Sequence, residues 1–286
     1  MVEEGTQREL LEKWQEKLPI FEPVEKEVLG MSIFNDAKQD GEKSLKMHRW
    51  GIRTRLPVVC FKLHAVPQDG STTKMEDLAG KGWPVKLDEE HWPVVSVWAR
   101  RNPFTFADVT WALNEAVSKG SGEKVARETT DQLFCYLQFE EDSEGRKIAA
   151  DYWNIRSKEP KTTDEGVSQN MQLSQVENRW ILWLAEMYGT EMKKLRGNGI
   201  LHGMLSGQNC SVGIEFSDNS NAEFWEVNES NFQSFISSHN NEVKRIIEAI
   251  TTLKFALENA QGKVFDEAES EEKIREAFYE SYLTKG

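Results

Sequence analysis

The feature that most limits how this chain folds is one strongly marked helix, predicted over residues 174–196. Its apolar stripe repeats at helical spacing and consists of Val176, Trp180, Leu184 and Met187. Ser174 and Glu177 have the spacing of a capping box, in which each side chain bonds the other residue's backbone N–H, and Gly197 is a typical helix stop. A chain of 286 residues is long enough to bury a sizeable core.

Strand and helix signals in the rest of the chain predict an α+β fold. Apolar runs at 56–66 and 91–101 predict two strands, with Pro93 at a strand start or in an edge strand. Helical spacing predicts helices over 7–17, from a Thr105–Asp108 capping box to Gly120, over 123–139, and on both sides of Gly262 from residue 230 onward. The polar stretch 36–46 predicts a loop or a polar helix turn. We expect several helices packed on a small, mainly antiparallel sheet, with a largely helical C-terminal part.

Residues 157–173 are polar and show no periodicity, which is typical of a connection between domains or of a functional loop. We therefore predict an N-terminal α+β region at 1–156, a polar connection at 157–173 and a C-terminal helix–hairpin–helix region at 174–286. The alternative is that the C-terminal region forms one domain with the first.

The charge balance is unfavourable for binding to extended polyanions. The chain carries 35 Lys and Arg against 48 Asp and Glu, a formal charge of −13. Broad contact with a nucleic-acid backbone or an anionic membrane needs an electropositive surface. No apolar run approaches the roughly 20 residues of a membrane-spanning helix, and residues 1–18 lack the features of a secretory signal. We expect a soluble protein of the cytoplasm or nucleus that is not secreted and binds no membrane.

The cysteines give no sign of a metal site or a disulfide framework. Cys60, Cys135 and Cys210 are far apart, and no Cys/His pair has metal-ligand spacing. A sparse, odd number of cysteines fits a reducing compartment. Each is predicted to be a small buried apolar residue, and we expect no cofactor and no metal.

The segment from Gly197 to Phe216, which we call the histidine segment, joins the predicted helix to residues typical of β-strands. Within it, His202, Leu205 and Asn209 match the order His-x-Asp-Leu-x-x-x-Asn. This segment resembles the catalytic loop of protein-kinase-like phosphotransferases, in which a long helix leads into such a loop and two short strands follow. The resemblance covers roughly residues 174–228, and it implies phosphoryl transfer assisted by the loop's Asp.

Met204 stands where that Asp belongs, and a thioether cannot orient or accept a hydroxyl proton. The chain also lacks Asp-Phe-Gly after the loop and a Gly-rich phosphate loop before it. One alternative is a plain helix-to-strand connector whose histidine bonds the backbone. Another is that His202 is a general base in an unrelated enzyme, because imidazole titrates near neutral pH.

A β-hairpin is predicted where 210–216 and 223–227 flank a turn-rich stretch. Glu215 and Glu223 are expected to face each other across it, where paired carboxylates can do acid/base chemistry or bind a hard cation. Alternation along a half-exposed strand gives the same pattern without chemistry. Glu215 therefore joins His202 as a candidate catalytic residue.

Two segments, 47–55 and 98–103, interleave Arg with Trp and predict a local site for an anion or for nucleic acid. The alternative is solvated strand ends beside core tryptophans. The binding candidates are Arg49, Trp50, Arg53, Arg55, Trp98, Arg100 and Arg101, together with Asn209 of the histidine segment.

Three functions follow from these patterns. In the absence of an intact catalytic motif, the first is an interaction or scaffold protein whose partner is another protein. The second is an enzyme that binds a small apolar molecule, with a Trp-lined pocket near residues 200–230. The third is nucleic-acid binding through the Arg/Trp segments.

Overall fold

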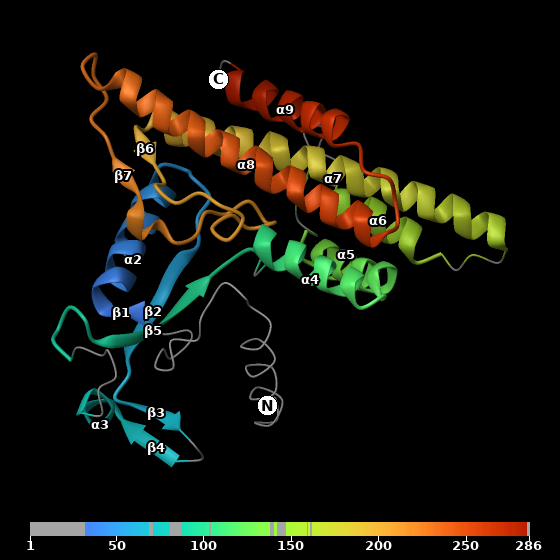
Figure 1. Ribbon diagram of the computed structural model, residues 1–286. Helices are drawn as coiled ribbons and strands as arrows, with labels where there is room; N and C mark the ends of the chain where they lie inside the picture. The colour runs from blue at the N-terminus through green and yellow to red at the C-terminus, as the bar shows by residue number, and fades with distance from the viewer. Residues whose placement is uncertain are drawn as a thin grey trace. The chain divides into compact units, whose positions relative to one another are not determined.

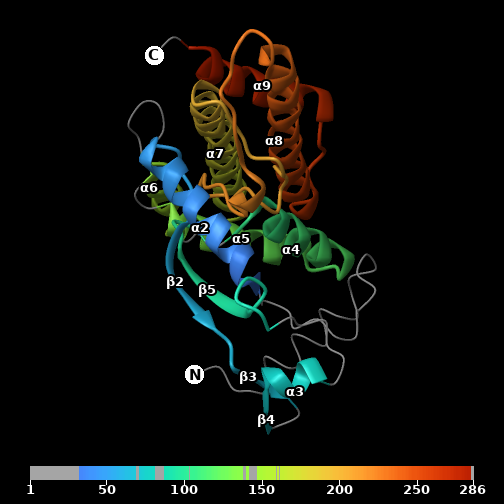
Figure 2. The same ribbon diagram turned by 90° about the vertical axis from the view of Figure 1, so that its left-hand side faces the viewer.

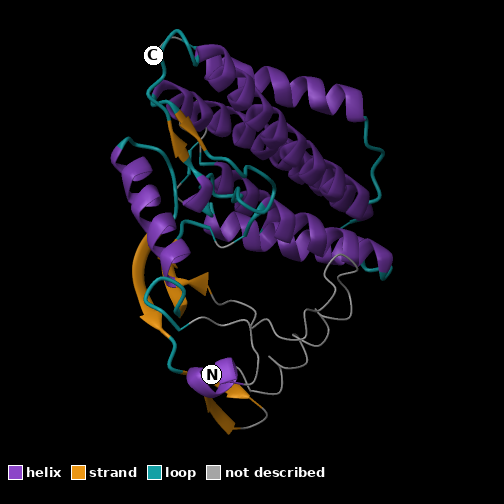
Figure 3. Cartoon of the chain, turned by 60° about the vertical axis from the view of Figure 1, so that its left-hand side comes forward, coloured by secondary structure: helices purple, strands orange, loops and turns teal. Residues whose placement is uncertain are grey.

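The computed structural model describes residues 32–68, 71–80, 87–102, 104–137, 140–141, 147–158, 160 and 162–284. Contacts divide the chain into two units, Met1–Lys38 with Val58–Val97 and Gln39–Pro57 with Trp98–Gly286. The described residues form eight α-helices and small antiparallel sheets, and the C-terminal part is helical. The predicted α+β class is thereby confirmed, and Figure 3 shows how far the helices outweigh the strands.

The first unit contains two small sheets. In one, β5 (Pro93–Ala99) lies between β1 (Ser32–Ile33) and β2 (Leu56–Lys62), and Ser32 pairs with Val94 in antiparallel register. In the other, β3 (Ala65–Gln68) and β4 (Ser71–Lys74) form a hairpin that leads into α3 (Met75–Gly80). The predicted strand at 91–101 is confirmed as β5, and Pro93 does begin it. The single strand predicted over 56–66 is instead divided between β2 and β3, which belong to different sheets.

The apolar core of the first unit is small. Val66, Met75 and Leu78 are buried together, with Leu63 and Leu87 packed against them. Strand β2, by contrast, exposes large apolar side chains, among them Val58 and Phe61.

The second unit is built on three long helices, α7 (Thr163–Gly197), α8 (Phe232–Ala260) and α9 (Glu267–Leu283), which lie side by side (Figures 1 and 2). α4 (Phe106–Ser118), α5 (Gly122–Tyr136) and α6 (Ile148–Arg156) pack against them. α7 and α9 approach closely at Gly189, where an added Cβ would come within 2.3 Å of the Phe278 carbonyl oxygen. The capping box predicted for α4 is confirmed, because Thr105 Oγ1 accepts the Asp108 N–H at 3.2 Å and Asp108 Oδ2 accepts the Thr105 N–H at 2.9 Å.

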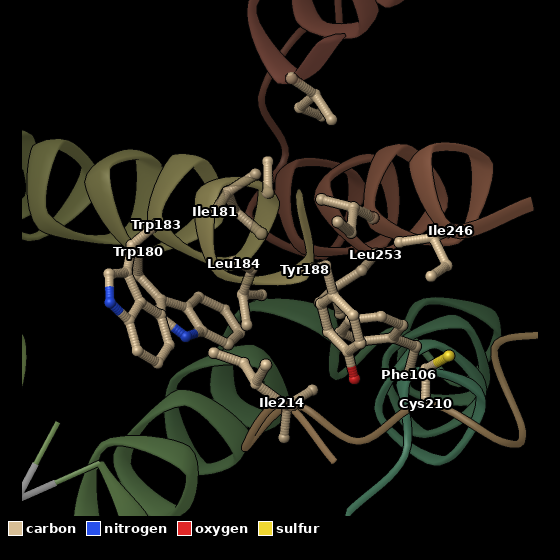
Figure 4. Close-up of a cluster of buried hydrophobic side chains, with 14 of the residues drawn as sticks. Phe106, Trp180, Ile181, Trp183, Leu184, Tyr188, Cys210, Ile214, Ile246 and Leu253 are labelled. Carbon is tan, nitrogen blue, oxygen red and sulfur yellow. The ribbon is translucent and has the colours of Figure 1, made fainter. Parts of the chain in front are cut away.

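One aromatic-rich core holds the second unit together (Figure 4). Trp180 and Trp183 of α7 are fully buried beside Leu184. Phe134 of α5 stacks on Tyr152 of α6 with ring centroids 4.1 Å apart. Aromatic side chains bury large areas, so these contacts account for much of the stability of the helical unit.

Helix α7 begins earlier than the sequence pattern indicates. Its N-cap is Thr162, whose side chain accepts the Glu165 N–H at 3.2 Å. The predicted capping box at Ser174 is therefore wrong, and Glu177 instead accepts a hydrogen bond from Gln261 at 2.9 Å. Residues 163–173 belong to the helix rather than to a polar loop, and they lack an apolar stripe because most of them are exposed.

The domain division at 1–156, 157–173 and 174–286 stays a prediction. The core of the second unit contains residues from both sides of 157–173, such as Phe106 and Ile246. The part of the predicted connection at 163–173 is the start of α7. The predicted helix at 7–17 lies outside the described residues.

The polar stretch 36–46 lies in α2 (Phe34–Arg49), a full helix of 16 residues. Its buried face is itself polar, which is why no apolar periodicity marks it. Asp40 Oδ1 accepts the Asn219 N–H at 2.9 Å, and the Asn219 side chain donates to Ser44 Oγ at 2.8 Å. Buried polar groups are stable when they are hydrogen-bonded in this way.

The predicted hairpin between 210–216 and 223–227 is not formed. β7 (Glu223–Phe224) pairs instead with β6 (Ile200–Leu201), at the end of α7. Residues 210–216 turn back on themselves, with Cys210 bridged to Phe216 and Ile214 at a φ of 60°. This tight loop uses the backbone groups that a hairpin partner would need.

Two of the three cysteines also differ from expectation. Cys210 is buried, whereas Cys60 and Cys135 are exposed free thiols. Among the described helices, none is long and apolar enough to cross a membrane.

Candidate functional site

The two Arg-bearing segments meet around one cavity of the second unit. The cavity has a volume of about 450 Å³. The side chains in its wall that carry or can carry charge are His48, Arg53, Arg100, Arg101, Lys194 and Glu215. We call this cavity the basic pocket.

Backbone pairing brings distant parts of the chain to the basic pocket. The Phe216 N–H donates to the Arg53 carbonyl at 3.1 Å, and the Arg55 N–H donates to the Phe216 carbonyl at 3.2 Å. Residues 53–55 are thereby fixed to the loop that carries Glu215. The pocket therefore depends on contacts between segments that are far apart in the sequence. The Thr54 hydroxyl, for example, donates to the Phe216 carbonyl, which is 162 positions away.

Two buried carboxylates hold the backbone of the pocket's arginines. Glu191 of α7 accepts the Arg53 N–H at 2.8 Å, and Glu215 accepts the Arg101 N–H at 2.8 Å. Both side chains are almost fully buried. Charged acceptors make strong hydrogen bonds to backbone N–H groups, so the main chain at both arginines is rigidly placed.

The side chains of Arg53 and Arg101 converge on one acceptor. Arg53 Nη1 lies 3.2 Å from Glu140 Oε2, and Arg101 Nη1 lies 2.9 Å from Glu140 Oε1. One negative charge therefore serves two guanidinium groups. Lys194 is neutralised separately, because its Nζ lies 2.6 Å from Glu191 Oε1.

Arg100 is the exception in this network. Its Nε and Nη2 are buried and have no hydrogen-bond partner in the structure. Burial, followed by the neighbouring charge of Arg55, lowers the pKa of Arg100. A guanidinium stays protonated in proteins, so this position holds a charge that the surrounding protein stabilises poorly.

Arg55 lies beside Arg100 but is itself neutralised. Its Nη2 forms an ion pair with Asp40 Oδ2, and its guanidinium lies 4.1 Å from the centre of the Trp98 ring. The network thus contains five cations, Arg53, Arg55, Arg100, Arg101 and Lys194, and five carboxylates, Asp40, Asp108, Glu140, Glu191 and Glu215. Its charges balance, whereas the chain as a whole has a formal charge of −13.

Glu215 does not face Glu223, contrary to the hairpin prediction. Glu215 is buried in the pocket wall, whereas Glu223 is exposed and accepts the Trp225 ring N–H at 2.8 Å. Burial raises the pKa of Glu215, although the N–H groups of Arg101 and Asn102 act to lower it. Its observed role is to hold backbone N–H groups.

His202 lies outside the basic pocket and is fully buried. Its Nε2 is 3.0 Å from the Ser217 carbonyl oxygen, and its backbone N–H donates to Glu242 at 3.2 Å. Burial lowers the pKa of His202 to about 4. A neutral imidazole enclosed in this way makes structural hydrogen bonds. This fits the alternative in which the segment is a helix-to-strand connector whose histidine bonds the backbone.

The other residues of the histidine segment follow the same pattern. The Asn209 side chain donates to the Met204 carbonyl at 2.8 Å, and Met204 itself is half exposed. His202, Met204 and Asn209, which carry the kinase-like resemblance, are therefore not arranged as a catalytic site. No group of three or more His, Cys, Asp or Glu side chains suited to a metal ion occurs in the described part of the chain.

Arg49 and Trp50 do not line the pocket, although the adjacent residues His48 and Gly51 do. Arg49 and Trp50 are exposed, and Trp50 packs edge-on against Phe224 at 5.6 Å. Of the tryptophans expected to line a pocket near 200–230, Trp180 and Trp183 are core residues, and Trp225 packs against Phe235 at 6.0 Å.

Sequence reasoning missed the acidic half of the site. Glu140 begins an acidic run and Lys194 lies in the last turn of α7, and neither was among the predicted site residues. The i,i+3 spacing of Glu191 and Lys194 is a usable local signal for their ion pair. Nothing local indicates that Glu140 meets Arg53, because their contact spans 87 positions.

A comparison of the chain with models of known protein families finds no match, and a comparison with curated protein sequences finds none either. The geometry and charge of the basic pocket are therefore the basis for a functional proposal.

Proposed function

We propose that this chain is an interaction protein and that its basic pocket binds an anionic group of a partner. The observation that carries this proposal is the Arg100 guanidinium, whose Nε and Nη2 are buried and have no hydrogen-bond partner. An anion in the pocket would supply the missing negative charge. Buried charges are stable only when they are paired, so an unpaired cation at a cavity wall is a strong reason to expect a ligand.

The neighbouring side chains suit the same chemistry. Guanidinium groups donate in a planar fork that matches carboxylate and phosphate oxygens. Arg101 is more than half exposed, so a ligand reaches it without disturbing the core. The backbone at Arg53 and Arg101 is already fixed by Glu191 and Glu215, which reduces the entropy lost on binding.

Extended nucleic acid fits this site less well than a single anionic group. Binding along a nucleic-acid backbone requires many uncompensated cations. Here nearby carboxylates balance the cations of the pocket, and the chain as a whole is acidic. The exposed Trp50 packs on Phe224 and is not one of the residues that line the pocket, which gives no support for base stacking beside the arginines.

Two further expectations belong to this proposal. The partner is another protein, and its location is the cytoplasm or nucleus. The three free cysteines support such a location, since two of them are exposed thiols that a reducing compartment keeps unpaired.

Titration of a fluorescein-labelled glutamate-rich octapeptide, followed by anisotropy at low salt, tests the proposal. We expect wild-type protein to bind and Arg101→Ala to bind about tenfold more weakly, the loss of one charge-assisted pair. Arg49→Ala is the matched control, because it removes an exposed arginine outside the pocket wall. Inorganic phosphate and a single-stranded oligonucleotide serve as competitors.

Equal loss of binding in Arg101→Ala and Arg49→Ala would show that only net charge matters and would overturn the pocket assignment. Tighter binding of inorganic phosphate than of the peptide, measured by this competition, would change the ligand class to a phosphorylated molecule. Strong competition by the oligonucleotide alone would favour nucleic-acid binding.

A further inference from the structure

Glu140 does not line the basic pocket, but its carboxylate contacts two arginines that do, Arg53 and Arg101. Each of its two carboxylate oxygens contacts the Nη1 of a different arginine, at 3.2 Å to Arg53 and 2.9 Å to Arg101. The Glu140 side chain is 12% exposed, so it is largely enclosed but reaches solvent. Carboxylates recognised by paired arginines adopt this kind of arrangement.

We infer that Glu140 is an internal pseudo-ligand and that an acidic peptide segment of the partner displaces it from Arg53 and Arg101. The inference rests on the proposed function, and it adds the class of partner and a mode of regulation. It follows from the geometry of three side chains that the structure describes.

The sequence around Glu140 indicates why the partner is an acidic peptide. Glu140 begins the run Glu-Glu-Asp-Ser-Glu, residues 140–144. The chain therefore already offers to its own arginines a carboxylate in an acidic peptide context. A partner segment with the same chemistry makes the same contacts and can also place a second carboxylate near Arg100.

The backbone beside Glu140 is anchored independently of its side chain. The Glu141 carbonyl oxygen accepts the Trp183 ring N–H at 2.9 Å, and Trp183 is buried in the core. Release of the Glu140 carboxylate therefore requires only a rotation of its own side chain. The arginines keep their backbone contacts with Glu191 and Glu215 throughout.

The exchange has a defined energetic consequence. While Glu140 is bound, the arginines are unavailable, so the apparent affinity for an external peptide is reduced by the fraction of molecules in which the pocket is free. Removing the negative charge of Glu140 weakens its hold on both arginines and increases that fraction. The partner then binds more tightly without any new contact.

The test compares Glu140→Gln with Glu141→Gln in the octapeptide titration. The two substitutions remove the same charge from adjacent residues, but only Glu140 bonds the arginines. We expect Glu140→Gln to bind the peptide about tenfold more tightly than wild type and Glu141→Gln to change affinity by less than about twofold. In an Arg101→Ala background the gain from Glu140→Gln should largely disappear.

Each outcome is informative. Weaker binding by Glu140→Gln would show that Glu140 positions the arginines for the ligand, and it would overturn the inference while leaving the proposed function intact. Equal gains in both Gln variants would reduce the effect to general electrostatics and would also overturn it. Failure of wild type and of Glu140→Gln alike to bind the peptide, with native thermal unfolding in both, would overturn the proposed function itself.

Discussion

The histidine segment, Gly197–Phe216, and the basic pocket share Glu215, and each contains buried nitrogens without a hydrogen-bond partner, Nδ1 of His202 in the first and Nε and Nη2 of Arg100 in the second. They differ in their surroundings, because His202 is fully buried whereas Arg100 lines a cavity. In the histidine segment, Glu242 accepts the N–H groups of His202 and Gly203 at 3.2 and 2.7 Å, and the imidazole bonds a carbonyl. In the basic pocket, Arg100 has buried nitrogens without a partner and lies beside a cavity.

This difference separates structural polar residues from candidate binding residues. A network that packed side chains enclose stabilises the fold and leaves no space for a ligand, even though Nδ1 of His202 has no hydrogen-bond partner. An unsatisfied charge beside open space costs stability until something binds. Substitutions in the two regions should therefore have different sizes and even different signs.

The largest expected contrast is between two glycines with positive φ. Gly203 has a φ of 86°, and an added Cβ would lie 2.6 Å from the Asn221 carbonyl oxygen. Gly51 at the pocket has a φ of 71° with open space around the same position. We expect Gly203→Ala to lower the free energy of unfolding by about 4 kcal/mol, from backbone strain plus steric overlap, and Gly51→Ala by about 1 kcal/mol. Urea denaturation of both variants measures this, and equal losses would contradict the view of the pocket as the open region.

The pH dependence of stability gives the second contrast. The pKa of His202 falls from 6.5 to about 4 on folding. Below pH 6.5 the imidazole is protonated in the unfolded chain, whereas in the folded chain it stays neutral down to about pH 4. This histidine therefore lowers the free energy of unfolding progressively as the pH falls from 6.5 to 4. The effect reaches about 3 kcal/mol, because one pKa unit corresponds to about 1.4 kcal/mol.

His202→Gln isolates this contribution from other titrating groups such as the buried glutamates. The gap in the free energy of unfolding between wild type and His202→Gln should shrink by about 3 kcal/mol between pH 7.5 and pH 4. A gap that stays constant over this range, measured by denaturant titration, would mean that His202 is accessible and titrates normally.

The smallest effect has the opposite sign. Replacing Arg100 by Met removes two buried donors that have no partner, while the methionine side chain fills similar space. We expect Arg100→Met to raise the free energy of unfolding by about 1 kcal/mol and to weaken peptide binding, a trade of stability for function. Arg101→Met is the control, since an exposed arginine should change stability by less than about 0.5 kcal/mol. A clear loss of stability in Arg100→Met would show that Arg100 is already well paired.

Local signals predicted the helices where the sequence carried a cap or a stripe. The Thr105–Asp108 capping box and the break at Gly262 are both observed. Prediction was wrong where the deciding contacts are distant. Ser174 looks like a cap because Glu177 follows it, but Thr162 caps the helix and Glu177 bonds Gln261, which is 84 positions away.

The sequence by itself determined that this is an acidic α+β chain with long amphipathic helices, because charge and helical periodicity depend on composition and near neighbours. It also pointed to Arg53, Arg55, Arg100 and Arg101 as a group. Only the tertiary structure decided that Glu140 bridges two of these arginines, that two nitrogens of Arg100 are buried without a hydrogen-bond partner and that His202 is enclosed. The physical reason is that a side chain's hydrogen-bond partners and solvent access are set by packing between segments far apart in the sequence, and no local pattern contains that information.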